Sequence, residues 1–361
     1  MRKPDAARAF AAAAFMVLAS AAMAQAPEAQ TPEAQTTPAP RDAPAKRIPV
    51  PDDVSPQLQA VIAQPLHSDW NTPPTTAEGW RRLAASQAAA AVAVVEPMAK
   101  RLHVKIEQSA IDGVKVYRVT PETIPARNAQ RLLIHLHGGC YVLNPGEAAL
   151  PEAVLMAGFS QTPVISVDYR MPPTAYFPAA LDDAMSVYRA ALKLAKPQDI
   201  GVFGSSAGGA LTLEMMLRAK QERLPLPGAL AVGTPMADET GHGDSHQTNA
   251  LVDNVLVSPT GFCDAAARFY ANGHDMADPM ISPLNGDLHD LSPTILTTGT
   301  RDLLLSDTVR THQKLLQSGV TADLLVFEGM SHAQYTFDDR IPEDRQAFTE
   351  ISAFLDRHLG R

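Results

Sequence analysis

The chain has 361 residues, of which 45% are hydrophobic and 19% are charged, so it carries enough apolar material for a substantial core. This composition excludes a coiled coil and a chain that is disordered throughout. A formal net charge of -9, without clustered Lys and Arg, argues against a nucleic-acid-binding surface, and we expect no nucleic-acid partner. One large domain is the default expectation.

Residues 1–24 have the pattern of a secretory signal peptide. Basic residues precede an apolar stretch at 10–18, and a small-x-small cleavage site follows at 22–24. The apolar stretch is shorter than the roughly 20 residues that span a bilayer, and no later segment is long enough. We therefore expect a secreted or periplasmic protein that begins at Gln25 and does not insert stably into a membrane.

Two segments of different character precede the first strands. Residues 25–50 are rich in Ala, Pro, Gln and Thr, which bury too little apolar surface to offset ordering entropy, so we predict a disordered linker. Residues 51–101 read as helical, with Thr76 as an N-cap and an Ala-rich run at 80–99 interrupted only at Pro97.

Strands of two kinds follow. Residues 104–108 and 114–119 alternate as a half-exposed hairpin does. Continuous apolar runs lie at 132–136, 164–167, 200–203, 229–232, 295–298 and 324–327. Helical stretches separate most of them or close the chain, at 147–159, 177–195, 207–221, 306–318 and 342–358. This alternation predicts an α/β fold, with a mainly parallel sheet covered by helices on both faces.

One interval breaks the alternation. Residues 235–290 contain no convincing strand and hold a helix near 259–270. An insertion at this point would lie above the carboxyl ends of the strands, where such sheets bind ligands.

Residues 204–208, Gly-Ser-Ser-Ala-Gly, match the pattern G-x-S-x-G. The match follows a short strand and opens a helix, which is the setting of a nucleophile elbow and indicates Ser206 as a nucleophile. Glycines at 204 and 208 suit a turn too tight for side chains. A glycine-rich turn without chemistry is the alternative.

The segment His137-Gly138-Gly139-Cys140 follows the buried strand at 132–136. Acyl transfer places negative charge on a carbonyl oxygen, and amide groups of Gly138, Gly139 and Ala207 are suited to an oxyanion hole. Each such donor contributes about 3 kcal/mol to lowering the barrier.

A serine hydroxyl requires a base, and the base requires a carboxylate that orients it. His332 and Asp302 follow the elbow in chain order, and each comes just after a predicted strand. We therefore predict that His332 is the general base and that Asp302 orients it. Asp307 is the competing acid, but it falls at the start of a helix, where Asp commonly interacts with the helix dipole.

Two other groups of side chains have potential chemistry. His242 and His246 flank Asp244, but nearby glycines argue against the helix that would align two metal ligands, so we predict no metal site. The chain has two cysteines, Cys140 and Cys263, which could form one bridge in an oxidising compartment. The sequence leaves open whether they pair.

From about Arg131 to the C-terminus, the chain resembles the bacterial hormone-sensitive-lipase-like esterases, a branch of the α/β-hydrolases. The resemblance rests on the His-Gly-Gly segment, the elbow, the loops of Asp302 and His332, Asp168-Tyr169-Arg170, residues 177–183 and Ser282-Pro283-Leu284. It implies hydrolysis of carboxylic esters without a cofactor, in a catalytic domain at 51–361 capped by residues from about 51–101 and 235–290.

Three positions depart from the family pattern. The family has a third glycine at the position of Cys140, an aspartate at that of Ser205 and a glutamate at that of Thr174. None of the three belongs to the predicted triad.

The predicted function is that of a serine carboxylesterase acting on small esters with short or medium acyl chains. An Ala-rich cap helix and an acidic segment at 237–244 do not suit an enzyme that embeds in a lipid surface. An amidase or acyltransferase using the same triad, or a non-catalytic ligand-binding protein on the same fold, are the alternatives. The sequence leaves the oligomeric state open.

Overall fold

A computed structural model describes residues 40–42, 44, 45 and 47–360. The predicted signal peptide at 1–24 and most of the predicted linker lie outside the described residues. The described residues between 40 and 50 are mostly exposed and form no regular secondary structure. The chain divides into two units, residues 1–47 and 48–361, and the described helices and strands all belong to the second.

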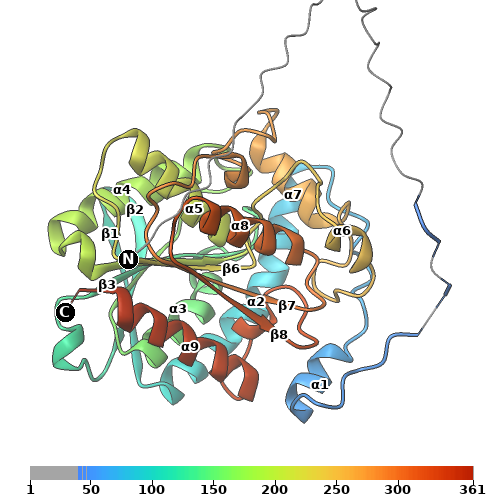
Figure 1. The fold of residues 1–361 in the computed structure, drawn as a ribbon, viewed down its shortest axis with the longest axis horizontal. Coiled ribbons are helices and arrows are strands. Elements are labelled where there is room, and N and C mark those ends of the chain that lie inside the picture. The colour runs from blue at the N-terminus through green and yellow to red at the C-terminus, as the bar shows by residue number, and fades with distance from the viewer. Residues whose placement is uncertain (1–39, 43, 46, 361) are drawn as a thin grey trace, which may run out of the picture. The chain divides into compact units, whose positions relative to one another are not determined.

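A sheet forms the centre of the second unit (Figure 1). It has eight strands in the order β1-β2-β4-β3-β5-β6-β7-β8. The first two strands form an antiparallel hairpin, β2 pairs antiparallel with β4, and the remaining pairs are parallel. The strand bounds are β1 Val104–Ile111, β2 Val114–Pro121, β3 Leu132–Leu136, β4 Val164–Val167, β5 Ile200–Ser205, β6 Ala229–Gly233, β7 Thr294–Gly299 and β8 Ala322–Phe327. The predicted mainly parallel sheet is confirmed.

Strands β4 to β7 are buried along their whole length, which explains why they read as continuous apolar runs rather than as alternating ones. Successive residues still point to opposite faces of the sheet. Ile134, Val202 and Leu230 belong to one apolar cluster, whereas Leu133 and Phe203 belong to another. The sheet therefore lies between two separate cores.

Helices cover both faces, and Figure 1 shows α4, α5 and α8 on one side with α3 and α9 on the other. The longer helices are α1 Pro56–Ile62, α2 Ala77–Arg101, α3 Leu150–Ser160, α4 Ala179–Leu194, α5 Ala207–Gln221, α7 Phe262–Ala271, α8 Leu305–Gln317 and α9 Pro342–His358, and α6 is the single turn Ser245–Thr248. No helix in the described part of the chain is both long and apolar enough to cross a membrane.

The two segments predicted as cap elements are helical and irregular. Helix α2 begins as predicted, because the Thr76 side chain accepts a hydrogen bond from the amide of Gly79 at 3.1 Å, and it continues through Pro97. Between residues 235 and 290 the chain forms α6, α7, the short 3₁₀ helix η4 (Pro283–Asn285) and loops, and contains no strand. The helix predicted near residues 259–270 corresponds to α7, which spans Phe262–Ala271.

Candidate active site

The predicted site residues gather at one edge of the sheet. Parallel strands place their carboxyl ends at the same edge, where α/β sheets bind ligands. The residues that follow these ends are His137, Gly138 and Gly139 after β3, Ser206 after β5, Asp302 after β7 and His332 after β8.

Ser206 occupies a sharp turn between β5 and α5. Its φ of 61° and ψ of -125° are rare for a residue with a side chain, and its amide donates to the Gly233 carbonyl at 2.9 Å. A Cβ atom added at Gly204 or Gly208 would lie 2.1 Å or 1.9 Å from the carbonyl oxygen of Leu136. Only glycine therefore allows the elbow to approach the end of β3 so closely.

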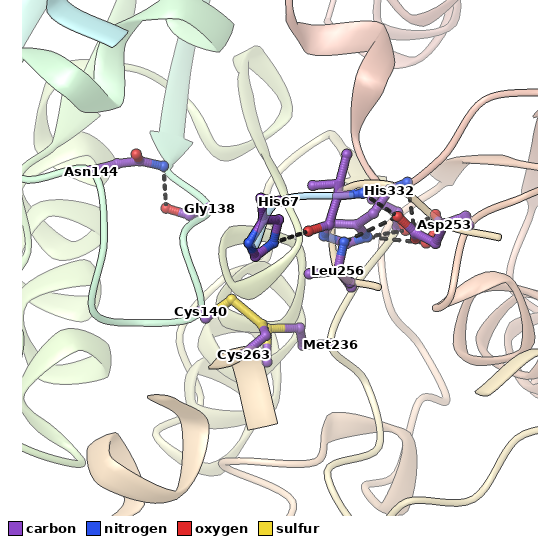
Figure 2. The surroundings of a disulfide bond; sticks show 12 residues. His67, Gly138, Cys140, Asn144, Met236, Asp253, Leu256, Cys263 and His332 are labelled. Atoms are coloured by element: carbon purple, nitrogen blue, oxygen red, sulfur yellow. Dashed lines mark hydrogen bonds and ion pairs between the residues drawn. A yellow bond between two sulfur atoms is a disulfide. The ribbon is translucent and has the colours of Figure 1, made fainter. Parts of the chain in front are cut away.

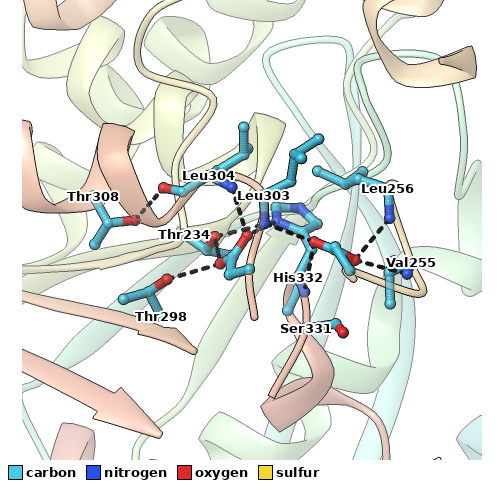
Figure 3. A network of polar contacts seen from close by, with 12 residues as sticks. Thr234, Val255, Leu256, Thr298, Leu303, Leu304, Thr308, Ser331 and His332 are labelled. Carbon is cyan, nitrogen blue, oxygen red and sulfur yellow. Dashed lines mark hydrogen bonds and ion pairs between the residues drawn. The ribbon is translucent and has the colours of Figure 1, made fainter. Parts of the chain in front are cut away.

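Asp302 is a fully buried carboxylate at the end of β7. Its Oδ1 atom lies 3.1 Å from Nδ1 of His332, and its Oδ2 atom accepts hydrogen bonds from the hydroxyls of Thr234 and Thr298 (Figure 3). Burial acts to raise the pKa of Asp302, but the charge of His332 and the hydrogen bonds from His332 and Thr234 outweigh it and leave the pKa below its usual value. The group is thus held ionised beside the imidazole.

His332 is buried, and the two nitrogens of its ring have different surroundings. Nδ1 contacts Asp302, whereas Nε2 has no hydrogen-bond partner among the described residues. Burial lowers the pKa of His332, but the charge and hydrogen bond of Asp302 and the charges of Asp253 and Asp307 raise it, and the result lies above the usual 6.5. His332 and Ser206 line the same cavity.

The competing acid, Asp307, has a different partner. It lies in the first turn of α8, where its Oδ1 atom is 3.2 Å from Nε2 of His246 and Oδ2 accepts from the amide of Asp238. The partner of His242 is the hydroxyl of Thr240. Within the described residues, no three His, Cys, Asp or Glu side chains are grouped as metal ligands.

The loop after β3 packs directly against the elbow. A Cβ atom at Gly138 would lie 2.8 Å from the Ser205 carbonyl oxygen and 3.3 Å from Cβ of Ser206. The Gly138 carbonyl accepts from the side-chain amide of Asn144 at 3.2 Å (Figure 2). Among the described residues, no hydrogen bond occupies the amide groups of Gly138 and Gly139. Both glycines line the same cavity as Ser206, and their amides are free to bind a ligand there.

Asp253 is a functional candidate that the sequence did not indicate, since it belongs to no motif. Its Oδ1 atom accepts from the amides of Val255 and Leu256 at 2.7 and 3.0 Å, and its Oδ2 atom accepts from those of Leu303 and His332 at 2.8 and 3.2 Å (Figure 3). One buried carboxylate therefore connects the 253–256 loop with the loops that carry Asp302 and His332. Burial and the charge of Asp302 raise the pKa of Asp253 to about 6.

Ser205, one of the departures from the family pattern, belongs to a polar cluster behind the elbow. Its hydroxyl donates to Glu152 Oε1 at 2.6 Å and lies 2.6 Å from the Tyr335 hydroxyl. The other oxygen of Glu152 is 3.3 Å from Nε2 of His135. Glu152, on α3, thus supplies a carboxylate next to position 205, where the family has an aspartate.

A cavity of about 540 Å³ lies over the elbow. Its walls come from α2, the loop after β3, α3, the segment 255–262 and the loop after His332. Among the residues that line it, Glu152 is the one Asp, Glu, Lys or Arg. The lining residues are Gln87, Ala90, Ala91, Val94, His137, Gly138, Gly139, Cys140, Leu143, Asn144, Ala148, Ala149, Pro151, Glu152, Ser205, Ser206, Val255, Leu256, Phe262, His332, Ala333, Thr336 and Phe337.

This fold and arrangement are those of an α/β-hydrolase, and the chain belongs to the α/β hydrolase fold family, whose pattern it matches over residues 133–336. It is 31% identical over 251 residues to an acetyl-hydrolase of Streptomyces hygroscopicus, covering 69% of this chain and 83% of that protein. It is also 31% identical over 246 residues to an esterase of Acinetobacter venetianus, covering 68% and 81%.

The chain is also similar to solved structures of esterases. The crystal structure of an esterase called E25 is 44% identical, with a TM-score of 0.85, and the match covers 89% of this chain and 99% of that one. An esterase from the bacterial hormone-sensitive lipase family is 28% identical, with a TM-score of 0.73, covering 85% and 99%. The predicted relationship to these enzymes is confirmed, and the chain is a hydrolase.

Replacing Asp253 with Asn tests its electrostatic effect on the site. The substitution removes a buried negative charge next to His332, so we expect the pKa of His332 to fall. An NMR titration of the imidazole resonances measures this change. Asp183→Asn is the matched control, because Asp183 is a buried carboxylate paired with Arg170, and this variant leaves the pKa of His332 unchanged. An equal pKa in wild type and Asp253→Asn contradicts the prediction.

Proposed function

We propose that this hydrolase is a serine carboxylesterase in which Ser206 forms an acyl-enzyme. The observation that carries the proposal is the arrangement of His332. Its Nδ1 atom is held by the ionised Asp302, and its Nε2 atom is unpartnered among the described residues, in a ring that lines the same cavity as Ser206. An imidazole held in this way can accept a proton from a neighbouring hydroxyl.

In the proposed reaction, Nε2 of His332 takes the proton of Ser206 as Oγ attacks the ester carbonyl carbon. Asp302 holds the tautomer and stabilises the imidazolium that forms. The amides of Gly138, Gly139 and Ala207 stabilise the oxyanion, each by about 3 kcal/mol. The alcohol leaves with the proton from His332, and water then releases the acid by the same sequence of steps.

We further propose a neutral ester with a short or medium acyl chain as the substrate. The cavity volume of about 540 Å³ is in the range of small-molecule sites, and its walls are mainly apolar. The carboxylate of Glu152 and the lack of a Lys or Arg among the lining residues disfavour esters that carry a negative charge. Similarity to an acetyl-hydrolase supports a short acyl group.

An amidase or acyltransferase would use the same acyl-enzyme and differ only in the leaving group or the acceptor. The relatives are named as an acetyl-hydrolase and esterases, which favours an ester over an amide. Rates measured in parallel on a p-nitrophenyl ester and the matched anilide distinguish an esterase from an amidase. The relatives named as esterases support an enzyme over a non-catalytic ligand-binding protein on the same fold.

We also propose that the protein is exported and that its mature chain begins at Gln25. The signal pattern at 1–24 supports export, and so does the disulfide between Cys140 and Cys263, because disulfides persist in oxidising compartments. N-terminal sequencing of protein recovered from the periplasm or the medium tests this.

We propose that α1, α2 and the 235–290 segment form the cap, because α2 and residues 255–262 contribute walls of the cavity.

Triad substitutions test the mechanism. Ser206→Ala, His332→Ala and the double variant are each expected to lose roughly 10⁴-fold or more in kcat, by similar amounts, because the residues act as one unit. Asp302→Asn is expected to lose somewhat less. Steady-state kinetics with a p-nitrophenyl ester measures these losses. Ser205→Ala is the neighbouring control, and the assignment of the elbow is wrong if this variant is inactive while Ser206→Ala is not.

The pH dependence tests the base. His332 must be neutral to accept a proton, and its pKa lies above 6.5, so kcat/KM is expected to fall with one proton as the pH drops through a value above 6.5. The raised pKa moves this loss to higher pH than for an unperturbed histidine. Rates of the purified mature enzyme between pH 5 and 9 measure it. A flat profile between pH 5 and 8 would remove His332 from this role.

Acyl-chain length tests the substrate class. Each methylene that the cavity accommodates adds specificity, typically about 1 to 3 kcal/mol, until the chain outgrows the site. We expect the highest kcat/KM at about eight carbons or fewer, as the resemblance to the hormone-sensitive-lipase-like esterases implies. Specificity constants for C2 to C16 p-nitrophenyl esters, with tributyrin and olive-oil emulsions beside them, measure the optimum. A maximum at C14 or C16, or a rise in rate when the substrate exceeds its solubility, indicates a lipase instead.

A further inference from the structure

A disulfide joins the predicted oxyanion loop to a helix of the 235–290 segment. Cys140 directly follows Gly139, and its Sγ atom is bonded to that of Cys263 in the first turn of α7 (Figure 2). The two cysteines are 123 residues apart in the sequence. The bond therefore links the wall that carries the oxyanion amides to an element outside the central sheet.

The loop has a backbone conformation that requires support. Gly139, Cys140 and Tyr141 have consecutive φ values of 115°, 51° and 61°. Left-handed conformations are unfavourable for residues with a Cβ atom, and two of these three residues have one. Such conformations persist only where the surrounding structure holds them. Relaxation of Cys140 to negative φ would move the adjacent peptide and, with it, the amides of Gly138 and Gly139.

The side chains of Cys140 and Tyr141 connect this segment to α7 and α5. Within the loop, the amides of Val142 and Leu143 donate to the Gly139 carbonyl. The Cys140 side chain is bonded to α7, and the ring of Tyr141 stacks on Tyr270 of the same helix with 4.3 Å between centroids. The Tyr141 hydroxyl donates to Glu214 of α5 at 2.6 Å. The disulfide is the covalent support, and it acts on the residue next to Gly139.

We propose that the Cys140–Cys263 disulfide positions the oxyanion loop, so that the oxidised protein turns over rapidly and the dithiol form turns over slowly. This inference rests on the proposed function, since it concerns the amides assigned to the oxyanion hole. The effect falls on the chemical step, because the oxyanion forms only as the carbonyl is attacked.

Reduction of the bond needs an external dithiol, which supplies two electrons and two protons. The S–S bond breaks, two S–H groups form, and the dithiol becomes its own disulfide. Both cysteines are buried, with 3% and 5% of their surfaces exposed, but Cys140 lines the substrate cavity. Cys140 therefore offers a small dithiol an approach to the bond from that cavity, and we expect an occupied cavity to slow the reduction.

The experiment compares kcat and KM for oxidised wild type, wild type reduced with dithiothreitol, Cys263→Ala and the double variant Cys140→Gly/Cys263→Ala. Thiols are counted by alkylation under denaturing conditions. Cys263→Ala and the reduced enzyme are expected to lose about tenfold or more in kcat with little change in KM. Glycine tolerates a φ of 51°, so the double variant is expected to recover much of the loss although it also lacks the bond.

The recovery by glycine separates positioning from general destabilisation, because the double variant lacks the bond as fully as Cys263→Ala does. Dithiothreitol added to the double variant controls for other effects of the reagent and is expected to change nothing. If the folded wild type resists reduction, the cysteine variants provide the comparison. Unchanged kcat in Cys263→Ala, or equal losses in the two cysteine variants, overturns the inference. An oxidised wild type without esterase activity would instead overturn the proposed function.

Discussion

The close approach of the turn after β5 to the end of β3 is the constraint on which the site depends. The carbonyl oxygen of Leu136 lies so near Gly204 and Gly208 that a side chain at either position would collide with it. Because of this contact, Ser206 lies next to Gly138, and Gly139 lines the same cavity. The strained backbone of Ser206 is a consequence of the same approach, and the surrounding sheet and helix hold it in place.

Three buried carboxylates organise the loops around this contact, each with different partners. Asp302 contacts the imidazole of His332, and Asp307 contacts His246. Asp253 forms no salt bridge within the described part of the chain but accepts hydrogen bonds from four backbone amides, two of them from the loops of Asp302 and His332. Carboxylate oxygens accept several hydrogen bonds at once, so one buried group can fix loops from distant parts of the sequence.

The structure explains two of the three departures from the family pattern. Cys140, in place of a glycine, is bonded to α7, so the loop gains a covalent support where it has a side chain in a left-handed conformation. Ser205, in place of an aspartate, donates to Glu152, and a carboxylate remains near this position although it comes from another helix. Nothing in the structure accounts for Thr174.

The sequence alone determined the strands, the helices and the positions of the elbow, because each depends on short-range pattern. Continuous apolar runs predicted the buried strands, and the order of Ser206, Asp302 and His332 at strand ends predicted their common edge. Tertiary structure decided which side chains meet. The pairing of Cys140 with Cys263, the link from Ser205 to Glu152 and the role of Asp253 in joining three loops all depend on distances between residues far apart in the chain. No local pattern encodes such distances, since they are set by how helices and loops pack on the sheet.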